Sequence, residues 1–249
     1  MPTRDWDGES YDRVSATMEA LGLEVLDRLE LSGDELVLDA GCGSRRITAA
    51  LIERVPRGHV IALDESPSMV QAATERLGGQ ADVRVMDLLE LDLEQPLDAI
   101  LSTATFHWIS DHERLFARLH AALRPGGALA AQCGGEGNIA HLRGRVRSVI
   151  EREPYARHFE GWRAPWHYAS PDVTRERLLA AGFAAAECWL APAPRQPEEP
   201  RAYLSTIVLG PHVQQLPEAL REPFMDDVLE VLGEPVVVDY VRLNIDAIA

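Results

Sequence analysis

Residues 35–46 read ELVLDAGCGSRR and decide the fold of this chain. The nearly continuous apolar run that stops at Gly41 is typical of a strand buried on both faces of a sheet. The glycines that follow let the backbone turn sharply and let a ligand approach main-chain N–H groups. Ile47, Leu51 and Val55 then recur at helical spacing. The stretch therefore predicts a strand, a ligand-binding turn and a helix.

The same alternation of strand and helix continues on both sides of this stretch. Apolar residues at helical spacing predict a preceding helix within residues 10–30. Further strands are expected at 59–65, 81–87, 97–105, 128–134, 185–192 and 236–248, and later helical stretches at about 198–209 and 216–232. Strand–helix alternation with short connections predicts an α/β fold with a doubly wound parallel sheet. Ligands bind such sheets beyond the carboxyl ends of the strands.

The composition restricts the class of protein. A net charge of −16 over 249 residues argues against a nucleic-acid-binding surface, because such surfaces need clustered basic residues. All 24 basic residues are arginine, so catalysis through a lysine Schiff base is excluded. Three cysteines without metal-ligand spacing predict no metal site and suit a reducing compartment. The polar N-terminus and the lack of a long apolar run lead us to expect a soluble, cytoplasmic protein.

The glycine-rich turn and the next two strand ends indicate the type of cofactor. A dinucleotide fingerprint needs glycine at position 46, where this chain has Arg46. S-adenosylmethionine has no diphosphate to cradle; its usual loop reads D-x-G-x-G-x-G, and here Arg45 replaces the last glycine. Asp64 ends the second strand, where a carboxylate can accept hydrogen bonds from both ribose hydroxyls. Asp87 ends the third, where it can accept one from the exocyclic adenine N–H. The pattern predicts adenosine binding.

With these motifs the chain resembles the class I S-adenosylmethionine-dependent methyltransferases, and within them the trans-aconitate methyltransferase-like group. The resemblance spans nearly the whole chain, and the cofactor motifs carry it most specifically. The matching segments are DWDGESYDR, VLDAGCG, ALDESPSM, the Met86–Asp87 pair, DAILSTATFHWISDHERLF, LRPGGAL and YVRLNIDAI.

The resemblance implies a Rossmann-like, seven-stranded sheet whose last strand is antiparallel, with an α-helical cap. Residues 1–136 would form the cofactor-binding core with an N-terminal gating helix, and residues 137–249 the cap and the last two strands. It also implies S-adenosylmethionine as cofactor, with Tyr11 as a gate for cofactor or substrate. The residues implied to bind the cofactor are Tyr11, Asp39, Gly41, Cys42, Gly43, Arg45, Asp64, Glu65, Met69, Asp87, Leu88 and Ser102.

Arg45 is the departure from the family pattern. A long side chain at this position could obstruct the carboxyl-terminal side of the loop, or it could grip the carboxylate of the cofactor. It could also turn to solvent, because a helix starts here. The sequence leaves these three alternatives open.

The candidate acceptor-binding residues follow the fourth strand and lie in the cap. His107 is a candidate base or hydrogen-bonding group for the substrate, and a packing histidine is the alternative. Arg143 and Arg147 are four residues apart, so they could pair a dicarboxylate or form a solvated arginine face. Trp162 and Trp166 fit either an apolar pocket or the cap's own core. The substrate candidates are Tyr11, His107, Trp108, Arg143, Trp162, Trp166 and His212.

These features predict a methyltransferase that acts on a small molecule, with O-methylation of a carboxylate-bearing, trans-aconitate-like metabolite as the first expectation. A degenerate methyltransferase fold with a binding role and an NAD-dependent oxidoreductase are the alternatives. A DNA or RNA methyltransferase is disfavoured because STATF stands where an acidic-aromatic [DN]PP[YFW] motif would follow the fourth strand. We expect a monomer or a weak homodimer. The acceptor stays open, because cap loops set it and the fold does not.

Overall fold

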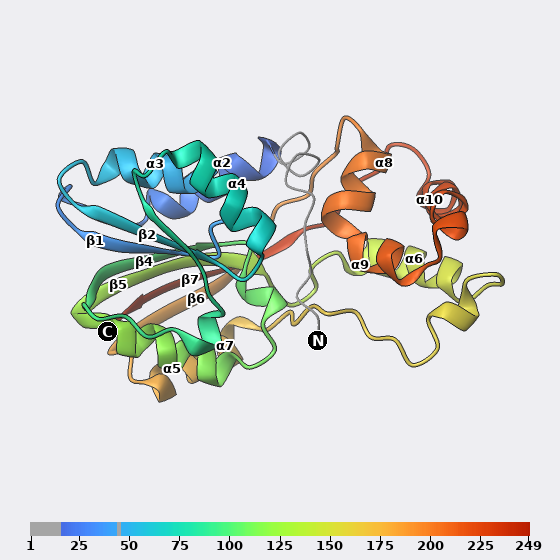
Figure 1. Ribbon diagram of the computed structural model, residues 1–249. Helices are drawn as coiled ribbons and strands as arrows, with labels where there is room; N and C mark the ends of the chain where they lie inside the picture. Colours follow the sequence, from blue (N-terminus) through green and yellow to red (C-terminus); the bar gives the residue numbers. More distant parts are fainter. Residues whose placement is uncertain (1–15, 44–45) are drawn as a thin grey trace.

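The computed structural model describes residues 16–43 and 46–249. Its centre is a seven-stranded sheet with the order β3-β2-β1-β4-β5-β7-β6 (Figure 1). Only β7 runs antiparallel to its neighbours. The strands are β1 (Leu36–Ala40), β2 (His59–Asp64), β3 (Asp82–Val85), β4 (Leu97–Thr103), β5 (Leu123–Gly134), β6 (Ala185–Pro192) and β7 (Val241–Ile248). This architecture confirms the expected Rossmann-like sheet with an antiparallel last strand.

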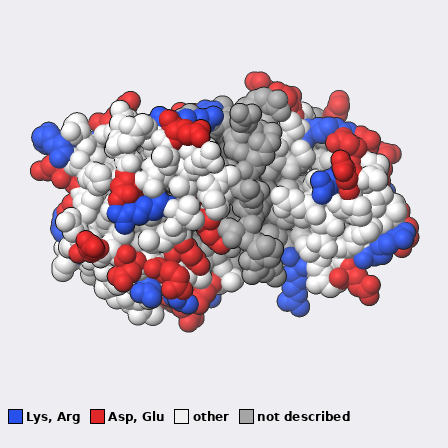
Figure 2. Space-filling model, in the orientation of Figure 1, with Lys and Arg blue, Asp and Glu red and all other residues white. Residues whose placement is uncertain are grey.

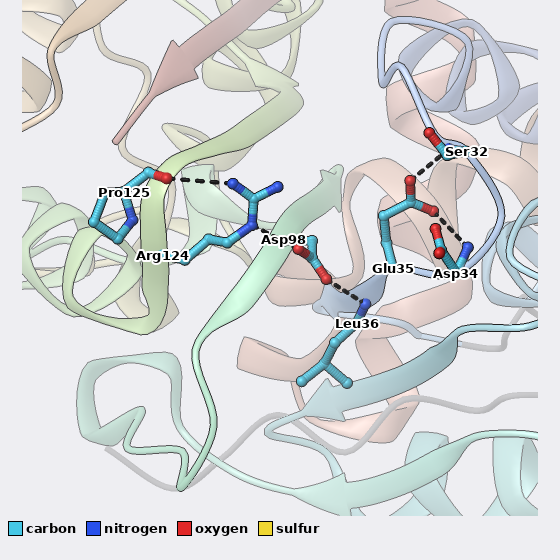
Figure 3. Close-up of polar contacts among 7 residues, drawn as sticks. All are labelled: Ser32, Asp34, Glu35, Leu36, Asp98, Arg124 and Pro125. Carbon is cyan, nitrogen blue, oxygen red and sulfur yellow. Dashed lines mark hydrogen bonds and ion pairs between the residues drawn. The ribbon is translucent and has the colours of Figure 1, made fainter.

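Polar contacts link the amino ends of the three central strands β1, β4 and β5. Asp98 accepts hydrogen bonds from the Leu36 main-chain N–H at 2.8 Å and from Arg124 Nε at 2.6 Å (Figure 3). The Glu35 carboxylate accepts main-chain N–H groups of the preceding turn, including that of Ser32. The Asp98 carboxylate of β4 therefore joins β1 and β5 to β4 at the amino ends of the three strands.

Helices cover both faces of the sheet (Figure 1). On one face, α2 (Ala16–Leu26), α3 (Arg46–Arg54) and α4 (Pro67–Leu77) share a core cluster with β1 through Val37. On the other face, α5 (His112–Ala122) and α7 (Pro171–Ala181) share a second cluster with β1 through Leu38. Adjacent residues of β1 thus point into different cores, which explains the unbroken apolar run of this strand.

A helical cap lies beyond the carboxyl ends of the parallel strands (Figure 1). It contains α6 (Ala140–Ile150), α8 (Pro200–Tyr203), a π-helical turn at Leu204–Val208, α9 (Gly210–Gln215) and α10 (Glu218–Leu232). Its apolar side chains form a third cluster, in which Leu142 and Val146 of α6 pack with Phe224 and Val228 of α10. The cap therefore has a hydrophobic core of its own.

Several element boundaries differ from the sequence expectation. β5 begins at Leu123 and not at residue 128, because Leu123 already pairs with Leu97 of β4 across an irregularity in the register. The last strand begins at Val241, since the preceding segment contributes only an isolated bridge between Val238 and Arg195. The helical stretch expected at 198–209 is divided into α8 and the π-helical turn.

Two properties of the surface bear on possible partners. Within the described ranges, no helix combines the length and the apolar character needed to cross a bilayer. Figure 2 shows acidic and basic side chains interspersed over the visible face, without a continuous basic area. This face offers no extended cationic surface to a polyanion.

Candidate functional site

The glycine-rich turn after β1 folds back onto the end of β2. The main-chain N–H groups of Gly41 and Cys42 both donate to the Leu63 carbonyl, at 2.8 and 2.9 Å. The Gly43 N–H donates to Oδ2 of Asp64 at 2.9 Å, and burial raises the pKa of this carboxyl. Each carboxylate oxygen has a second acceptor position, so Asp64 can hold the turn and still accept hydrogen bonds from a ligand.

The two glycines of this turn meet different requirements. Gly41 has φ +89°, and a Cβ atom here would lie 2.1 Å from Oγ1 of Thr105, which follows β4. Gly43 has φ +50°, and a Cβ atom there would meet no atom of the described residues within 4 Å. Gly41 therefore permits the close approach of two chain segments. Gly43 leaves open space over the turn, where a ligand can approach the main chain.

Asp39 provides a buried carboxylate just below the turn. Its side chain is 1% exposed, and Oδ2 accepts a hydrogen bond from Thr48 Oγ1 at 2.7 Å. The other oxygen, Oδ1, is buried and has no hydrogen-bond partner among the residues that the structure describes. Burial raises the pKa of Asp39 to about 7, helped by the nearby charge of Asp64. A positively charged ligand group beside Oδ1 would supply the missing partner and favour the ionised form.

The ends of β2 and β3 bring three carboxylates together. Partial burial, Asp87 and Asp64 raise the pKa of Glu65. Asp87 is exposed and caps the short 3-10 helix Leu88–Glu90 by accepting a main-chain N–H two residues further on. Met69 and Leu88 are buried, and Leu88 belongs to a core cluster. The carboxylates of Asp64, Glu65 and Asp87 are thus close enough to influence one another at the end of β2.

Ser102 lies at the same edge, and its hydroxyl donates to the Ala40 carbonyl at 2.7 Å. This contact ties the end of β4 to the start of the glycine turn. Two of the predicted site residues, Tyr11 and Arg45, lie outside the described residues. The neighbouring Arg46 begins α3 and pairs with Glu19 of α2 at 2.7 Å.

His107 lies just past β4 in the 3-10 helix Phe106–Trp108 and is 8% exposed. Its Nδ1 accepts a hydrogen bond from the Gly134 N–H at 3.3 Å. Burial is the main cause that lowers the pKa of His107 to about 3, with smaller contributions from Arg242 and His112. The ring is therefore neutral at physiological pH. Because Nδ1 accepts, we assign the ring proton to Nε2, which makes His107 a hydrogen-bond donor on its other side.

Aromatic rings extend from His107 toward the cap. The His107 ring centroid lies 5.9 Å from that of Tyr168, and Tyr168 stacks on Trp166 at 6.0 Å with an interplanar angle of 9°. Trp166 in turn lies 6.1 Å from Trp108. We define His107, Trp108, Trp166 and Tyr168 as the aromatic row. It connects the end of β4 to the cap.

Arg242 and Tyr168 are not among the candidate site residues predicted above, yet both adjoin His107. Arg242 is 4% exposed in β7, and its guanidinium carbon lies 4.6 Å from the Tyr240 ring centroid. Burial raises the pKa of Tyr168 to about 12, while the charges of Arg143 and Arg242 oppose this rise. The signal in the sequence that could have identified Arg242 is a charged residue between the apolar residues Val241 and Leu243 of the last strand.

Four of the predicted substrate residues line one cavity of about 930 Å³ in the cap: Arg143, Trp162, Trp166 and His212. His107 and Trp108 do not line it, but they adjoin its wall through the aromatic row. Whether Arg143 and Arg147 pair around one ligand or form a solvated face stays a prediction, but Arg147 already has a partner at the end of its own helix. Arg147 Nε donates to Glu151 at 2.6 Å, one helical turn further on.

Comparison with known proteins gives a family match, two relatives and a solved structure of similar fold. Residues 37–127 match the family described as methyltransferase domain. The chain is 33% identical over 239 residues to a trans-aconitate 2-methyltransferase of Paracidovorax citrulli, covering 89% of this chain and 86% of that protein. It is 29% identical over 191 residues to an uncharacterised methyltransferase of Schizosaccharomyces pombe, covering 74% and 72%. The fold matches Haemonchus contortus phosphoethanolamine N-methyltransferase 2, solved with S-adenosyl-L-methionine, at TM-score 0.64 and 16% identity, covering 97% of this chain and 56% of that chain.

Proposed function

The chain belongs to the class I S-adenosylmethionine-dependent methyltransferases, and from this premise we propose that it methylates a carboxylate oxygen of a small metabolite. Its cofactor is S-adenosylmethionine. This membership decides against the NAD-dependent oxidoreductase that the glycine turn alone had left open. The relatives named trans-aconitate 2-methyltransferase support an acidic acceptor of that kind.

The residues around the glycine turn fit the methionine end of the cofactor. The α-ammonium group is the cation that the unpartnered Oδ1 of Asp39 lacks. The open space over Gly43 suits a ligand that lies against the main chain. We therefore assign Asp39, Gly41 and Gly43 to the methionine moiety, with Cys42 and Ser102 holding the shape of the turn.

The ends of β2 and β3 fit the adenosine end. Asp64 keeps acceptor positions for the ribose hydroxyls after it has bound the turn. Asp87 is exposed at the end of β3, where its carboxylate can accept a hydrogen bond from the adenine amino group. Met69 and Leu88 would form the apolar floor beneath the base, and Glu65 would lie beside the ribose.

The observation that carries the choice of a carboxylate acceptor is the state of His107. Its Nδ1 already accepts the Gly134 N–H, and its pKa of about 3 makes the ring a very weak base. The neighbouring Tyr168 and Cys133 have pKa values of about 12, so they stay protonated and cannot act as bases near neutral pH. A phenol or alcohol acceptor needs a base, whereas a carboxylate is already ionised. This arrangement supports an acceptor that brings its own negative charge.

When bound, S-adenosylmethionine supplies an electrophilic methyl group, which a carboxylate oxygen takes by in-line displacement while the sulfur keeps the electron pair of the broken C–S bond. No proton is released in this reaction. The chain's contribution is to align the acceptor and exclude water. We propose that Nε2–H of His107 donates a hydrogen bond to the acceptor and that the buried charge of Arg242 attracts it. The rings of Trp108 and Tyr168 keep water from the reacting carboxylate.

A turnover screen tests this proposal. The purified protein is incubated with methyl-labelled S-adenosylmethionine and either trans-aconitate and related acids or phenolic compounds. We expect the labelled methyl group to appear in the products formed from the acids. Mild alkali should release this label, because methyl esters hydrolyse and aryl methyl ethers do not. Asp64→Asn is the control, and it should lose turnover together with cofactor binding by calorimetry. Label only in alkali-stable ethers would overturn the carboxylate assignment, and no heat with the cofactor would favour the degenerate-fold alternative.

A further inference from the structure

The cap cavity lies between α6, the segment that follows it and α9. Its volume of about 930 Å³ is at the upper end of the range for small-molecule sites. Apolar and aromatic side chains line much of it, including Phe159, Trp162 and Trp166. A second cavity of about 340 Å³ lies at the opposite edge of the sheet, around Arg28 and Asp246, and these two residues pair with each other. The cap cavity is therefore the better candidate for a ligand.

The arginines of the cap cavity differ in their partners. Arg147 pairs with Glu151 at 2.6 Å, and Arg157 pairs with Glu153 at 2.9 Å. Arg143 makes no ion pair within the described part of the chain; its guanidinium carbon lies 5.8 Å from the Tyr168 ring centroid. A cation over an aromatic ring keeps its N–H donors available for an anion. Arg143 is therefore the arginine of this cavity that can receive a carboxylate.

His212 is a second polar group that lines this cavity. It is 6% exposed, and its buried Nδ1 has no hydrogen-bond partner within residues 16–43 and 46–249. Its ring lies 4.7 Å from Trp162 and 5.7 Å from Trp166, centroid to centroid. Burial and the charge of Arg143 lower the pKa of His212 to about 4, so the ring is neutral and has one donor and one acceptor nitrogen. Buried polar atoms are rarely left unsatisfied, and a polar ligand group would satisfy this one.

Trp166 joins this cavity to the reacting centre. It lines the cavity and also lies 6.1 Å from Trp108 and stacks on Tyr168, next to His107. The aromatic row therefore runs from His107 to the wall of the cavity.

We propose that the cap cavity binds the non-reacting end of the methyl acceptor, and that this end is a second carboxylate on a planar unsaturated or aromatic body. Arg143 pairs with the carboxylate, His212 hydrogen-bonds to it, and the rings of Trp162 and Trp166 enclose the body. The inference rests on the methyl-transfer activity proposed above. It narrows the acceptor class to planar acids with at least two carboxylates.

Direct binding tests the inference without turnover. Trp162 and Trp166 report occupation of the cavity, so tryptophan fluorescence is titrated with trans-aconitate, terephthalate and the monocarboxylate benzoate in the absence of cofactor. We expect both polycarboxylates to bind at least about tenfold more tightly than benzoate, since one charge-assisted pair separates them. Arg143→Gln should remove that tenfold advantage and leave benzoate within about twofold.

Arg147→Gln is the matched control, because Arg147 lies on the same helix and lines the same cavity but already pairs with Glu151. We expect it to change the dissociation constants by less than about twofold. His212→Phe keeps a ring in place and should weaken the polycarboxylates several-fold. Circular dichroism confirms that each variant is folded.

The outcomes separate this inference from the proposed function. Equal binding of benzoate and the polycarboxylates, an equal loss in the Arg143 and Arg147 variants, or no fluorescence change with any acid overturns the inference. If acids are methylated but Arg143→Gln leaves their KM unchanged, the subsite is wrong and the function stands. If the acids bind as expected but none is methylated, the binding site stands and the carboxylate acceptor is wrong.

Discussion

Replacing Asp39 by asparagine should remove a large pH dependence from the stability of the cofactor-free protein. Asp39 is 1% exposed below the glycine turn, Thr48 Oγ1 donates to one of its oxygens, and the charge of Asp64 lies nearby. Burial raises its pKa from the ordinary 3.8 to about 7. Asparagine keeps the shape and the acceptor for Thr48, but it does not ionise.

Proton linkage determines whether the free energy of unfolding rises or falls with pH. The folded state holds the Asp39 proton more tightly than the unfolded state, so folding becomes less favourable as pH rises from about 4 to about 7. The slope is about 1.4 kcal/mol per pH unit, and the whole shift amounts to about 4 kcal/mol. Between pH 5 and pH 8 the free energy of unfolding of the wild type should fall by about 3 kcal/mol relative to Asp39→Asn.

Urea denaturation of both proteins at pH 5, 6.5 and 8 measures this difference, because contributions of other groups cancel between them. Thr48→Val is a further control: it removes the hydrogen bond that lowers the pKa, so the fall should extend to higher pH. Saturating S-adenosylmethionine should restore more stability to the wild type than to the variant at pH 8, because the ammonium group favours ionised Asp39. A difference that stays within about 0.5 kcal/mol across this range would refute the reasoning about the buried carboxyl.

Two further substitutions address the turn and the end of β4. Gly41→Ala should lower the free energy of unfolding by about 3 kcal/mol, because its Cβ would overlap Thr105, whereas Gly43→Ala should cost about 1 kcal/mol. Calorimetry should nevertheless show at least about tenfold weaker cofactor binding by Gly43→Ala, and normal binding would contradict the open space assigned to the ligand. For His107, with a pKa of about 3, we expect kcat to show no titration between pH 6 and 9. His107→Asn should lower kcat about 10- to 100-fold, because the hydrogen bond to the acceptor is lost. If kcat of the wild type instead titrates near pH 6.5 and this titration disappears in the variant, His107 acts as a base.

The sheet could be predicted from the sequence, and the edge proposed to bind the cofactor could be identified, because both depend on local patterns. β1 is a continuous apolar run, and Asp39, Gly41 and Asp64 lie at or directly after the ends of adjacent strands. In a parallel sheet these ends meet at one edge, so order along the chain determines position in space. Pairing between distant segments was less predictable: β5 begins early because Leu123 reaches Leu97 of β4.

The residues around the acceptor were harder to predict because packing, and not spacing, brings them together. Tyr168 reaches His107 and Arg143 from a different segment, and Arg242 comes from the last strand. The spacing of Arg143 and Arg147 permitted a shared ligand, but Glu151 lies at the same spacing from Arg147 and pairs with it. Which of the two arginines can bind a ligand therefore depends on whether an acidic residue follows it one helical turn later.

The proposed cofactor site and the proposed acceptor site lie in different parts of the fold, and this separation affects specificity. The residues proposed to bind the cofactor lie on the strands of the sheet or close to their ends, whereas the cavity is lined by α6, α9 and the segment between residues 153 and 166, which pack in a separate core. Substitutions in the cap can therefore change the acceptor while the cofactor motifs stay intact. Motifs such as DAGCG identify the reaction but say little about the acceptor. Arg143 and His212 determine the acceptor if the proposed subsite is correct, so relatives that keep both residues should share a preference for polycarboxylates.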